Sequence, residues 1–152
     1  MIVKLGNKQT QDCLCIAKQL PNYFNKNGLI DMERDLKSHQ VYAYNYNKQI
    51  IAFISFYFLS YLKAEISWMA VHPNFQQKGY GTDLVKFLID SLKELDVAEI
   101  CVKTLAPTVA YKPYETTRKF YEKNGFELRE IIDPYEPWGE GNPCAIYVKN
   151  LL

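Results

Sequence analysis

Apolar side chains alternate with polar ones, or run on without a break, in several short stretches of the chain, and this pattern predicts β-strands. Residues 49–59 (QIIAFISFYFL) are apolar on both faces of the expected strand, which is typical of a sheet that helices cover on both sides. A tight hairpin is expected at Asn47 and Lys48, between this strand and residues 40–46. The other strands are expected at residues 1–5, 63–71, 98–105, 126–132 and 144–151.

Apolar residues recur at every third or fourth position after residue 80, which predicts an amphipathic helix of about four turns. The positions of this apolar stripe are Leu84, Phe87, Leu88, Leu92 and Leu95. Shorter helices are expected at residues 8–20, ending before Pro21, and at residues 31–37. Another is expected at residues 114–124, where Gly125 suits the left-handed residue that often ends a helix.

The order of these elements favours an α/β fold in one domain covering residues 1–152, a length typical of single domains. A strand, a helix and a second strand follow one another over residues 63–105, so the two strands are predicted to be parallel, with a right-handed crossover. Two irregular segments, residues 106–113 and 133–144, are long for a compact domain, and such loops tend to carry function.

Charge and composition exclude several classes of protein. The 18 basic and 17 acidic residues nearly cancel and are scattered, so the chain lacks the basic surface of a duplex-binding protein. The first residues lack the continuous apolar segment of a secretory signal, and the most apolar stretch, residues 50–59, is far shorter than the roughly 20 residues of a membrane-spanning helix. We therefore expect a cytoplasmic protein that binds neither nucleic acid nor membrane.

The four cysteines, Cys13, Cys15, Cys101 and Cys144, contain no pair of CxxC units, and the chain has only two histidines that could join them as metal ligands. Reduced thiols with a structural role fit this spacing better than a metal site or a disulfide framework, and no metal is expected.

A glycine-rich turn, HPNFQQKGYGTDL (residues 72–84), lies between the strand 63–71 and the amphipathic helix. Backbone N–H groups at a helix start have no partner within the helix, and together with the helix dipole they bind phosphates readily. The dinucleotide pattern GxGxxG is excluded because Leu84 stands where a third small residue is required, and no P-loop string occurs. From two glycines alone, a turn that only relieves backbone strain is equally compatible.

The string Gln76-Gln77-Lys78-Gly79-Tyr80-Gly81 matches the pattern [Q/R]-x-x-G-x-[G/A]. Three segments resemble the GNAT superfamily, which transfers acetyl groups from acetyl-CoA to amines. They are the hexad with its flanking strand and helix (residues 68–88), the segment TTRKFYEKNGFE (residues 116–127) and the closing residues 138–151. The resemblance covers residues 50–152. It implies a single-domain α/β fold with a mixed central sheet of about six to seven strands, flanked by helices on both faces, in which two parallel strands splay apart to admit the cofactor.

Carried over residue by residue, the resemblance implies a binding site for acetyl-CoA. The main chain of Met69, Ala70 and Val71 would bond the pantetheine arm as if it were an extra strand, and the plain alternative for these side chains is core packing. The pyrophosphate would be wrapped by backbone N–H groups of Gln76, Gln77, Lys78, Gly79, Tyr80, Gly81 and Thr82. The side chains of Gln76 and Lys78 would face the phosphates.

Amine acetylation needs a group that takes a proton from the amine and a group that protonates the departing thiolate. Tyr121 occupies the position of the family's tyrosine and is the candidate acid; simple packing beside Phe120 is the alternative. Glu65 is the candidate base, acting directly or through water, because strand alternation places Glu65, Ser67 and Met69 on one face. The alternative for Glu65 is a solvated surface glutamate. His72 is a second candidate base, but a His-Pro pair at the end of a strand is also typical of a turn.

Tyr114, Thr117, Arg118 and Tyr121 have the spacing of one helix face, so Arg118 could contact a phosphate or a substrate carboxylate. A solvated basic face with Lys119 and Lys123 is the alternative. The chain departs from many relatives at Thr104, close to where they carry an asparagine.

These features lead to the hypothesis of an N-acetyltransferase that acts on a primary amine of a small molecule or peptide. Asp133, Glu136 and Glu140, near Trp138 in the second long loop, would suit a cationic amine, although a solvated acidic loop has the same composition. The alternative hypothesis is a non-catalytic acetyl-CoA sensor on the same fold. A single-strand binder that stacks bases on its tyrosines fits the balanced charge poorly. Many members of the family are dimers, so a homodimer is compatible with the resemblance.

Overall fold

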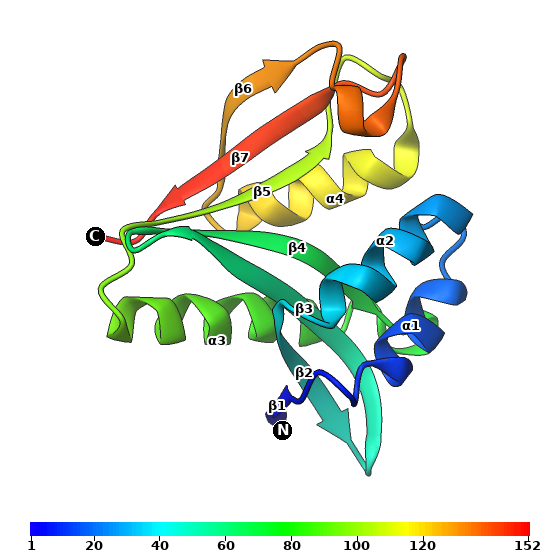
Figure 1. The fold of residues 1–152 in the computed structure, drawn as a ribbon, viewed down its shortest axis with the longest axis vertical. Helices are drawn as coiled ribbons and strands as arrows, with labels where there is room; N and C mark the ends of the chain where they lie inside the picture. Colours follow the sequence, from blue (N-terminus) through cyan, green and yellow to red (C-terminus); the bar gives the residue numbers. More distant parts are fainter.

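The computed structural model describes residues 1–152 and contains a seven-stranded sheet with four α-helices and two short 3-10 helices (Figure 1). The strands are β1 (Ile2–Leu5), β2 (Gln40–Tyr46), β3 (Gln49–Ser60), β4 (Lys63–Val71), β5 (Glu99–Leu105), β6 (Glu127–Ile132) and β7 (Cys144–Asn150). The helices are α1 (Gln11–Lys18), α2 (Lys26–Leu36), α3 (Tyr80–Glu94), α4 (Lys112–Lys123), η1 (Pro73–Phe75) and η2 (Glu136–Trp138).

The sheet has the order β1-β2-β3-β4-β5-β7-β6, and β4 and β5 are its only parallel neighbours. A mixed α/β sheet of this size and the parallel pairing around α3 were both expected from the sequence, and both are confirmed. The expected hairpin between β2 and β3 is also present. Its two central residues, Asn47 and Lys48, both have positive φ, as a two-residue type I′ turn requires.

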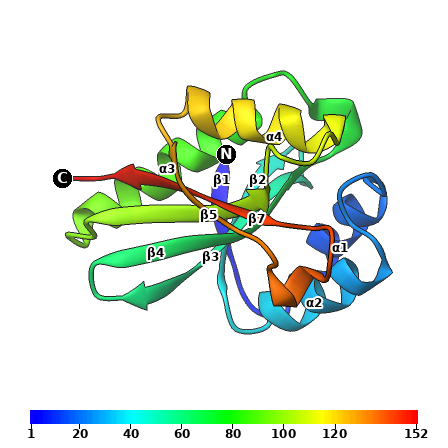
Figure 2. The same ribbon diagram turned by 90° about the horizontal axis from the view of Figure 1, so that it is seen from above.

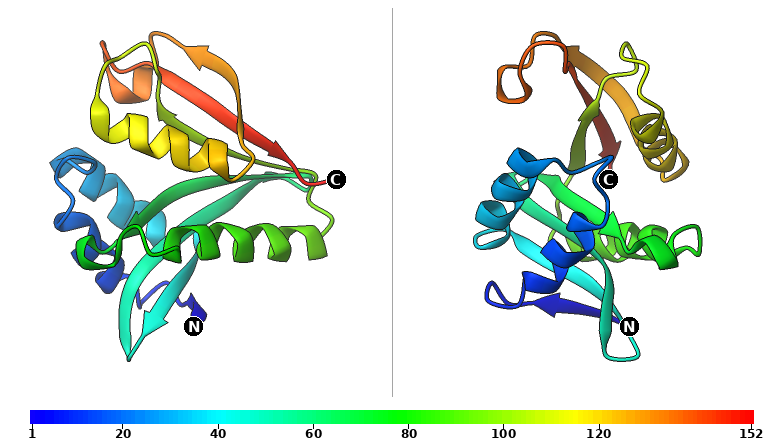
Figure 3. Two further views of the ribbon diagram at one scale, coloured as in Figure 1. Left: turned by 180° about the vertical axis from the view of Figure 1, so that it is seen from behind. Right: turned by 90° about the vertical axis from the view of Figure 1, so that its right-hand side faces the viewer.

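Helices cover both faces of the sheet (Figure 2 and Figure 3), as the two apolar faces of β3 predicted. On one face α3 and α4 bury a core that includes Ile54, Phe56 and Leu88. On the other face α1 and α2 pack on Phe53 and form a smaller core. The right-hand view of Figure 3 shows the two helical layers on opposite sides of the strands, with η2 on the side of α1 and α2.

Helix α2 begins at Lys26, five residues before the expected start at residue 31. The Asn25 side chain accepts a hydrogen bond from the N–H of Gly28 at 2.8 Å and so satisfies one of the free groups of the first turn. The glycine within that turn, which has a low helix propensity, concealed the start of the helix in the sequence.

The apolar stripe predicted for α3 is buried at Leu84, Leu88 and Leu92 but not at its two other positions. Phe87 is exposed and packs edge-on against Tyr42, with ring centroids 5.0 Å apart. Leu95 follows the last helical residue and is also exposed.

Candidate active site

Strands β4 and β5 pair over only part of their length. Their register runs from Lys63 opposite Glu99 to Ile66 opposite Val102, and beyond this pair the strands diverge (Figure 1). From Ser67 to Val71, β4 pairs with β3 alone, so one edge of its backbone has no strand partner. An unpaired strand edge presents N–H and C=O groups to an extended ligand.

The free edge of β4 leads to the glycine-rich turn and the start of α3. Gly79 is the N-cap residue and has φ +90°, a conformation that favours glycine, and no side chain caps the helix. The first N–H groups of α3 therefore remain free of capping side chains at the positive end of the helix dipole. This arrangement is suited to an anion.

Three polar side chains of the turn contact the turn itself or the end of β4, and the Gln76 side chain that was expected to face a phosphate is one of them. The amide of Gln76 donates to the Val71 carbonyl at 3.1 Å and ties the turn to the end of β4. The ammonium of Lys78 lies 5.7 Å from the centre of the Phe75 ring. The ring nitrogen Nδ1 of His72 accepts from the N–H of Asn74 at 3.1 Å and caps η1, which agrees with the turn alternative for this histidine.

Helix α3 approaches β4 and α4 at Gly81. A Cβ added at Gly81 would lie 3.1 Å from Cε of Met69 and 3.5 Å from the Phe120 ring, so a larger residue here would have to displace the end of the Met69 side chain. The hydroxyl of Tyr121 lies 3.8 Å from the sulfur of Met69. Burial raises the pKa of Tyr121, with a smaller contribution from Tyr114, so the phenol holds its proton at neutral pH. Tyr121 thus brings a proton donor to the free edge of β4.

Arg118 is buried, and its guanidinium donates to the Leu105 carbonyl at 2.7 Å. The hydroxyl of Thr104, also buried, donates to the same carbonyl at 3.3 Å. The expected face with Tyr114, Thr117 and Tyr121 does turn inward, so the solvated alternative for Arg118 is wrong. In this structure Arg118 anchors α4 to the end of β5.

The prediction that Glu65, Ser67 and Met69 share one face of β4 is wrong. Ser55 pairs with Trp68 and Phe56 pairs with Ile66, so Ser67 is an extra residue in a β-bulge. The bulge reverses the alternation, because it inserts one residue into a pattern of period two. Met69 therefore packs on the α3 side of the sheet, whereas Glu65 and Ser67 lie on the side of α1 and α2.

Glu65 is the centre of a group of side chains that we call the polar cluster. Its members are His39, Ser55, Tyr57, Glu65, Ser67 and Lys103. The carboxylate of Glu65 accepts from the hydroxyl of Tyr57 at 2.6 Å and lies 3.4 Å from the ammonium of Lys103. It is only 7% exposed, so the solvated-surface alternative is wrong.

Burial and the negative charge of Glu65 set the protonation of the groups around it. Burial and the hydrogen bond to Glu65 raise the pKa of Tyr57, and burial together with Glu65 raises the pKa of the Cys101 thiol to about 12. Burial alone would lower the pKa of Lys103, but Glu65 and Tyr135 outweigh it and leave that pKa raised. At neutral pH the Tyr57 phenol and the thiol of Cys101, which adjoins the cluster, are therefore neutral beside the Glu65–Lys103 ion pair.

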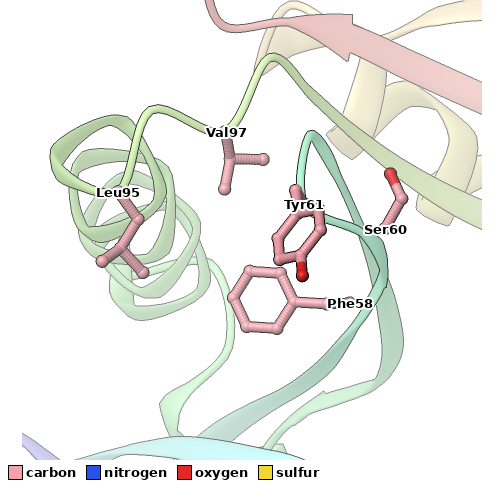
Figure 4. A pocket seen from close by; sticks show the side chains of 5 residues that line it. All are labelled: Phe58, Ser60, Tyr61, Leu95 and Val97. Atoms are coloured by element: carbon pink, nitrogen blue, oxygen red, sulfur yellow. The ribbon is translucent and has the colours of Figure 1, made fainter.

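Other parts of the molecule carry less chemistry. A surface depression of about 600 Å³ lies between the β3–β4 hairpin and the end of α3 (Figure 4). It is lined by Phe58, Ser60, Tyr61, Leu95 and Val97, which include no carboxylate, imidazole or amine.

No group of three or more His, Cys, Asp or Glu side chains is placed to hold a metal, and all four cysteines are free thiols. None of the helices combines the length and apolarity needed to cross a membrane.

The family model for the acetyltransferase (GNAT) domain matches residues 37–128, which include the polar cluster, the free edge of β4, the glycine-rich turn and Tyr121. The chain belongs to the GNAT acetyltransferase family. No curated protein matches this acetyltransferase by sequence.

Solved structures of GNAT acetyltransferases share the fold over the whole chain. A GNAT-family acetyltransferase from Desulfovibrio desulfuricans is 14% identical, with a TM-score of 0.82 and coverage of 100% of both chains. An aminoglycoside 6'-N-acetyltransferase complexed with coenzyme A is 16% identical, with a TM-score of 0.77 over 100% of this chain and 97% of the other. An N-acetyltransferase from Staphylococcus aureus is 15% identical, with a TM-score of 0.72 over 100% and 98%. Identities this low establish the fold alone.

The structure of this GNAT acetyltransferase brings Met69, Gly81 and Tyr121 together at one contact, and it places Glu65 on the opposite face of β4. Sequence reasoning missed His39 and Tyr57 as parts of the site. The available signal was the presence of two serines, Ser55 and Ser67, within otherwise apolar strands, since a buried hydroxyl requires a partner.

Proposed function

We propose that this GNAT acetyltransferase moves the acetyl group of acetyl-CoA to a primary amine of a small molecule or peptide, by direct attack of the amine on the thioester. The observation that carries the proposal is the free edge of β4, which runs from the end of the β4–β5 pairing at Ile66 to the uncapped start of α3 at Gly79. An extended arm with an anionic end fits such a track, because the edge offers strand-like hydrogen bonds and the helix start offers partial positive charge.

The main chain of Met69, Ala70 and Val71 would bond the pantetheine arm. The backbone N–H groups from Gln76 to Thr82 would surround the pyrophosphate, with Gly79 and Gly81 allowing close approach and Lys78 adding a full positive charge. Because the Gln76 amide already donates to the Val71 carbonyl, its side chain holds the turn on the strand in this scheme. The aromatic contact between Tyr80 and Tyr44, with centroids 4.6 Å apart, fixes the first turn of α3.

Acetyl-CoA supplies an activated acyl group. The amine nitrogen forms a bond to the acyl carbon while the carbon–sulfur bond breaks. The ammonium loses two protons in all. One leaves through a base, and the other replaces the proton that is given to the thiolate. Tyr121 gives the thiolate its proton, since its buried phenol is protonated and adjoins Met69. An N–H of Met69 or Val71 stabilises the oxyanion. The other proton is accepted on the opposite face of β4, in the polar cluster around Glu65.

The acceptor would enter from the side of α1, α2 and η2. The β6–β7 loop places Tyr135 next to Trp138, with centroids 4.9 Å apart, and the ammonium of Lys103 lies 5.8 Å from the Tyr135 ring. The loop also carries Asp133, Glu136 and Glu140, which suit a cationic amine. Support for an amine acceptor comes from the similar fold of an enzyme named as an aminoglycoside N-acetyltransferase.

The test is to incubate the purified protein with acetyl-CoA and a panel containing an aminoglycoside, a polyamine, an amino acid and a short peptide, and to follow release of free thiol. Acetylation of at least one amine is expected, with coenzyme A binding measured separately by calorimetry. Binding of coenzyme A with no release of thiol from any amine would favour the non-catalytic sensor instead. Failure to bind coenzyme A would contradict both.

A further inference from the structure

Two irregularities of the sheet meet at Ser67. It is the extra residue of the β4 bulge, and it is the first residue of β4 after the pairing with β5 has ended at Ile66 and Val102. Its hydroxyl lies on the side of α1 and α2, where the acceptor would enter, whereas the free edge of β4 begins at its own backbone. A side chain at this position adjoins both the track proposed for the thioester and the acceptor side of the sheet.

The hydroxyl of Ser67 belongs to a short chain of hydrogen bonds that ends at a histidine. Its oxygen lies 2.8 Å from Nδ1 of His39 and 2.7 Å from the hydroxyl of Ser55, which is completely buried. Ser55 also reaches the Trp68 carbonyl at 3.4 Å, which holds the bulge in place. In the tautomer of His39 with its hydrogen on Nε2, Nδ1 accepts the proton of Ser67.

The second nitrogen of His39, Nε2, is open to solvent. It has no hydrogen-bond partner in the protein. Because every buried side-chain nitrogen or oxygen atom of the chain has such a partner, Nε2 is not buried. Water can therefore accept a hydrogen bond from the Nε2–H group and stabilise the imidazolium that forms when Nδ1 receives a proton. Imidazole is also the side chain that most readily exchanges protons near neutral pH.

We propose that His39, acting through the hydroxyl of Ser67, is the base that takes the proton of the acceptor amine. The inference rests on the proposed function and assigns one step of it. The ammonium gives one proton to the Ser67 oxygen as Ser67 gives its own proton to Nδ1 of His39, and the neutral amine then forms the carbon–nitrogen bond. His39 becomes an imidazolium; after the amide product has left, its Nδ1 proton passes back through the Ser67 hydroxyl to water, which restores the starting tautomer.

Glu65 is a positioning residue in this scheme. Its two carboxylate oxygens are occupied by Tyr57, by Lys103 and by the thiol of Cys101 at 3.6 Å. The bond to Tyr57 in turn fixes the phenol ring, which stacks on the imidazole of His39 with centroids 4.6 Å apart and planes inclined by 20°. Glu65 thus acts on the amine only through the orientation of His39.

The ionisable groups around His39 come from four elements. From β3, Tyr57 faces the ring as a neutral phenol, and beyond its hydroxyl stands the Glu65–Lys103 pair of β4 and β5. From the end of α2, Asp35 accepts the indole N–H of Trp68 at 2.9 Å. The only cation of this group, Lys103, is paired with Glu65.

The test compares His39→Gln and Ser67→Ala with wild type, using the amine of the panel that wild type acetylates fastest. Glutamine retains a hydrogen bond to Ser67 but cannot take the proton, and Ser91→Ala on the outer side of α3 is the matched control for serine replacement. Both site variants are expected to lose kcat by about 100-fold near neutral pH, the size typical of a lost general base, with the affinity for coenzyme A unchanged within about twofold. In His39→Gln the acidic limb of the pH profile of kcat/KM near neutral pH should be replaced by a rise toward the ordinary pKa of the amine, near 10.

A Glu65→Gln variant separates the two candidate bases. It is expected to lower kcat but to keep the acidic limb, since His39 is still present. Retention of that limb in His39→Gln, or its loss in Glu65→Gln alone, would overturn the proposal. Nitrogen NMR of the imidazole in the free protein tests the same point without turnover. A spectrum that shows the hydrogen of neutral His39 on Nδ1 would also overturn the proposal. A wild-type protein that binds coenzyme A and acetylates no amine would instead refute the proposed function, and the inference with it.

Discussion

The phenol oxygen of Tyr121 lies 3.8 Å from the sulfur of Met69, so helix α4 delivers a buried hydroxyl to the free edge of β4. Replacement of Tyr121 by Phe removes that hydroxyl and preserves the edge-on ring contacts with Phe120 and Phe126. We expect kcat to fall by about 100-fold because the thiolate loses its proton donor, while the affinity for coenzyme A stays within about twofold. Steady-state kinetics and calorimetry measure the two effects separately.

A Tyr121→Phe enzyme with wild-type kcat would remove the acid role. A variant that loses affinity for coenzyme A in proportion to kcat would instead indicate that the hydroxyl contributes to binding. Phe126→Leu, in the same core and without a polar group, controls for general loosening of the packing.

The parallel strand-helix-strand unit and the glycine turn could be predicted from the sequence because each depends on a local sequence pattern, whereas the divergence of the two strands was implied only by the resemblance to GNAT enzymes. A strand, the hexad from Gln76 to Gly81 and a regular apolar stripe mark one strand-helix-strand unit, and the structure contains it. The side of β4 on which Glu65 lies could not be predicted, since strict alternation holds only where no residue is inserted, and the bulge at Ser67 inserts one. The role of His39 depends on contacts across the sheet that no sequence spacing encodes.

The two glycines of the turn should respond differently to alanine. Gly79 has φ +90° with nothing near its missing Cβ, whereas Gly81 is helical and would place a methyl group 3.1 Å from Cε of Met69. Gly79→Ala is expected to lower the free energy of unfolding by about 1 kcal/mol through backbone strain. Gly81→Ala should leave it nearly unchanged, because better helix propensity offsets the shift of a flexible side chain, but it should lower kcat by moving Met69. Denaturant titration and kinetics check both, and equal losses of stability would contradict this distinction.

Arg118 is predicted to stabilise the fold without contributing to cofactor affinity. Arg118→Met leaves the buried Leu105 carbonyl without its 2.7 Å donor, so we expect a loss of about 1–3 kcal/mol in the free energy of unfolding. Lys119→Met is the matched control: its partner Glu115 is exposed, and the expected change is below about 0.5 kcal/mol. Affinity for coenzyme A should stay within about twofold in both variants. A selective loss of affinity in Arg118→Met would restore the phosphate contact considered from the sequence.

The four cysteines should differ sharply in reactivity and in their effect at alkaline pH. Cys15 is exposed, whereas Cys13, Cys101 and Cys144 are buried. Burial raises the pKa of Cys13 to about 12 and that of Cys144 to about 11, from the ordinary value of 9.0. A disulfide reagent should therefore modify one thiol in the native protein and all four in denaturant, as counted by absorbance.

The same burial predicts the direction of a stability change with pH. A thiol whose pKa is higher in the folded state than in the unfolded state contributes stability below pH 9.0, and this contribution is lost as the pH rises through the folded value of about 12 for Cys13. We expect the free energy of unfolding to fall across this range, and to fall less in Cys13→Ala than in Cys15→Ala, whose thiol is exposed. Denaturant titrations at a series of pH values measure the slopes. Equal slopes in the two variants would show that ionisation of Cys13 does not contribute to alkaline unfolding.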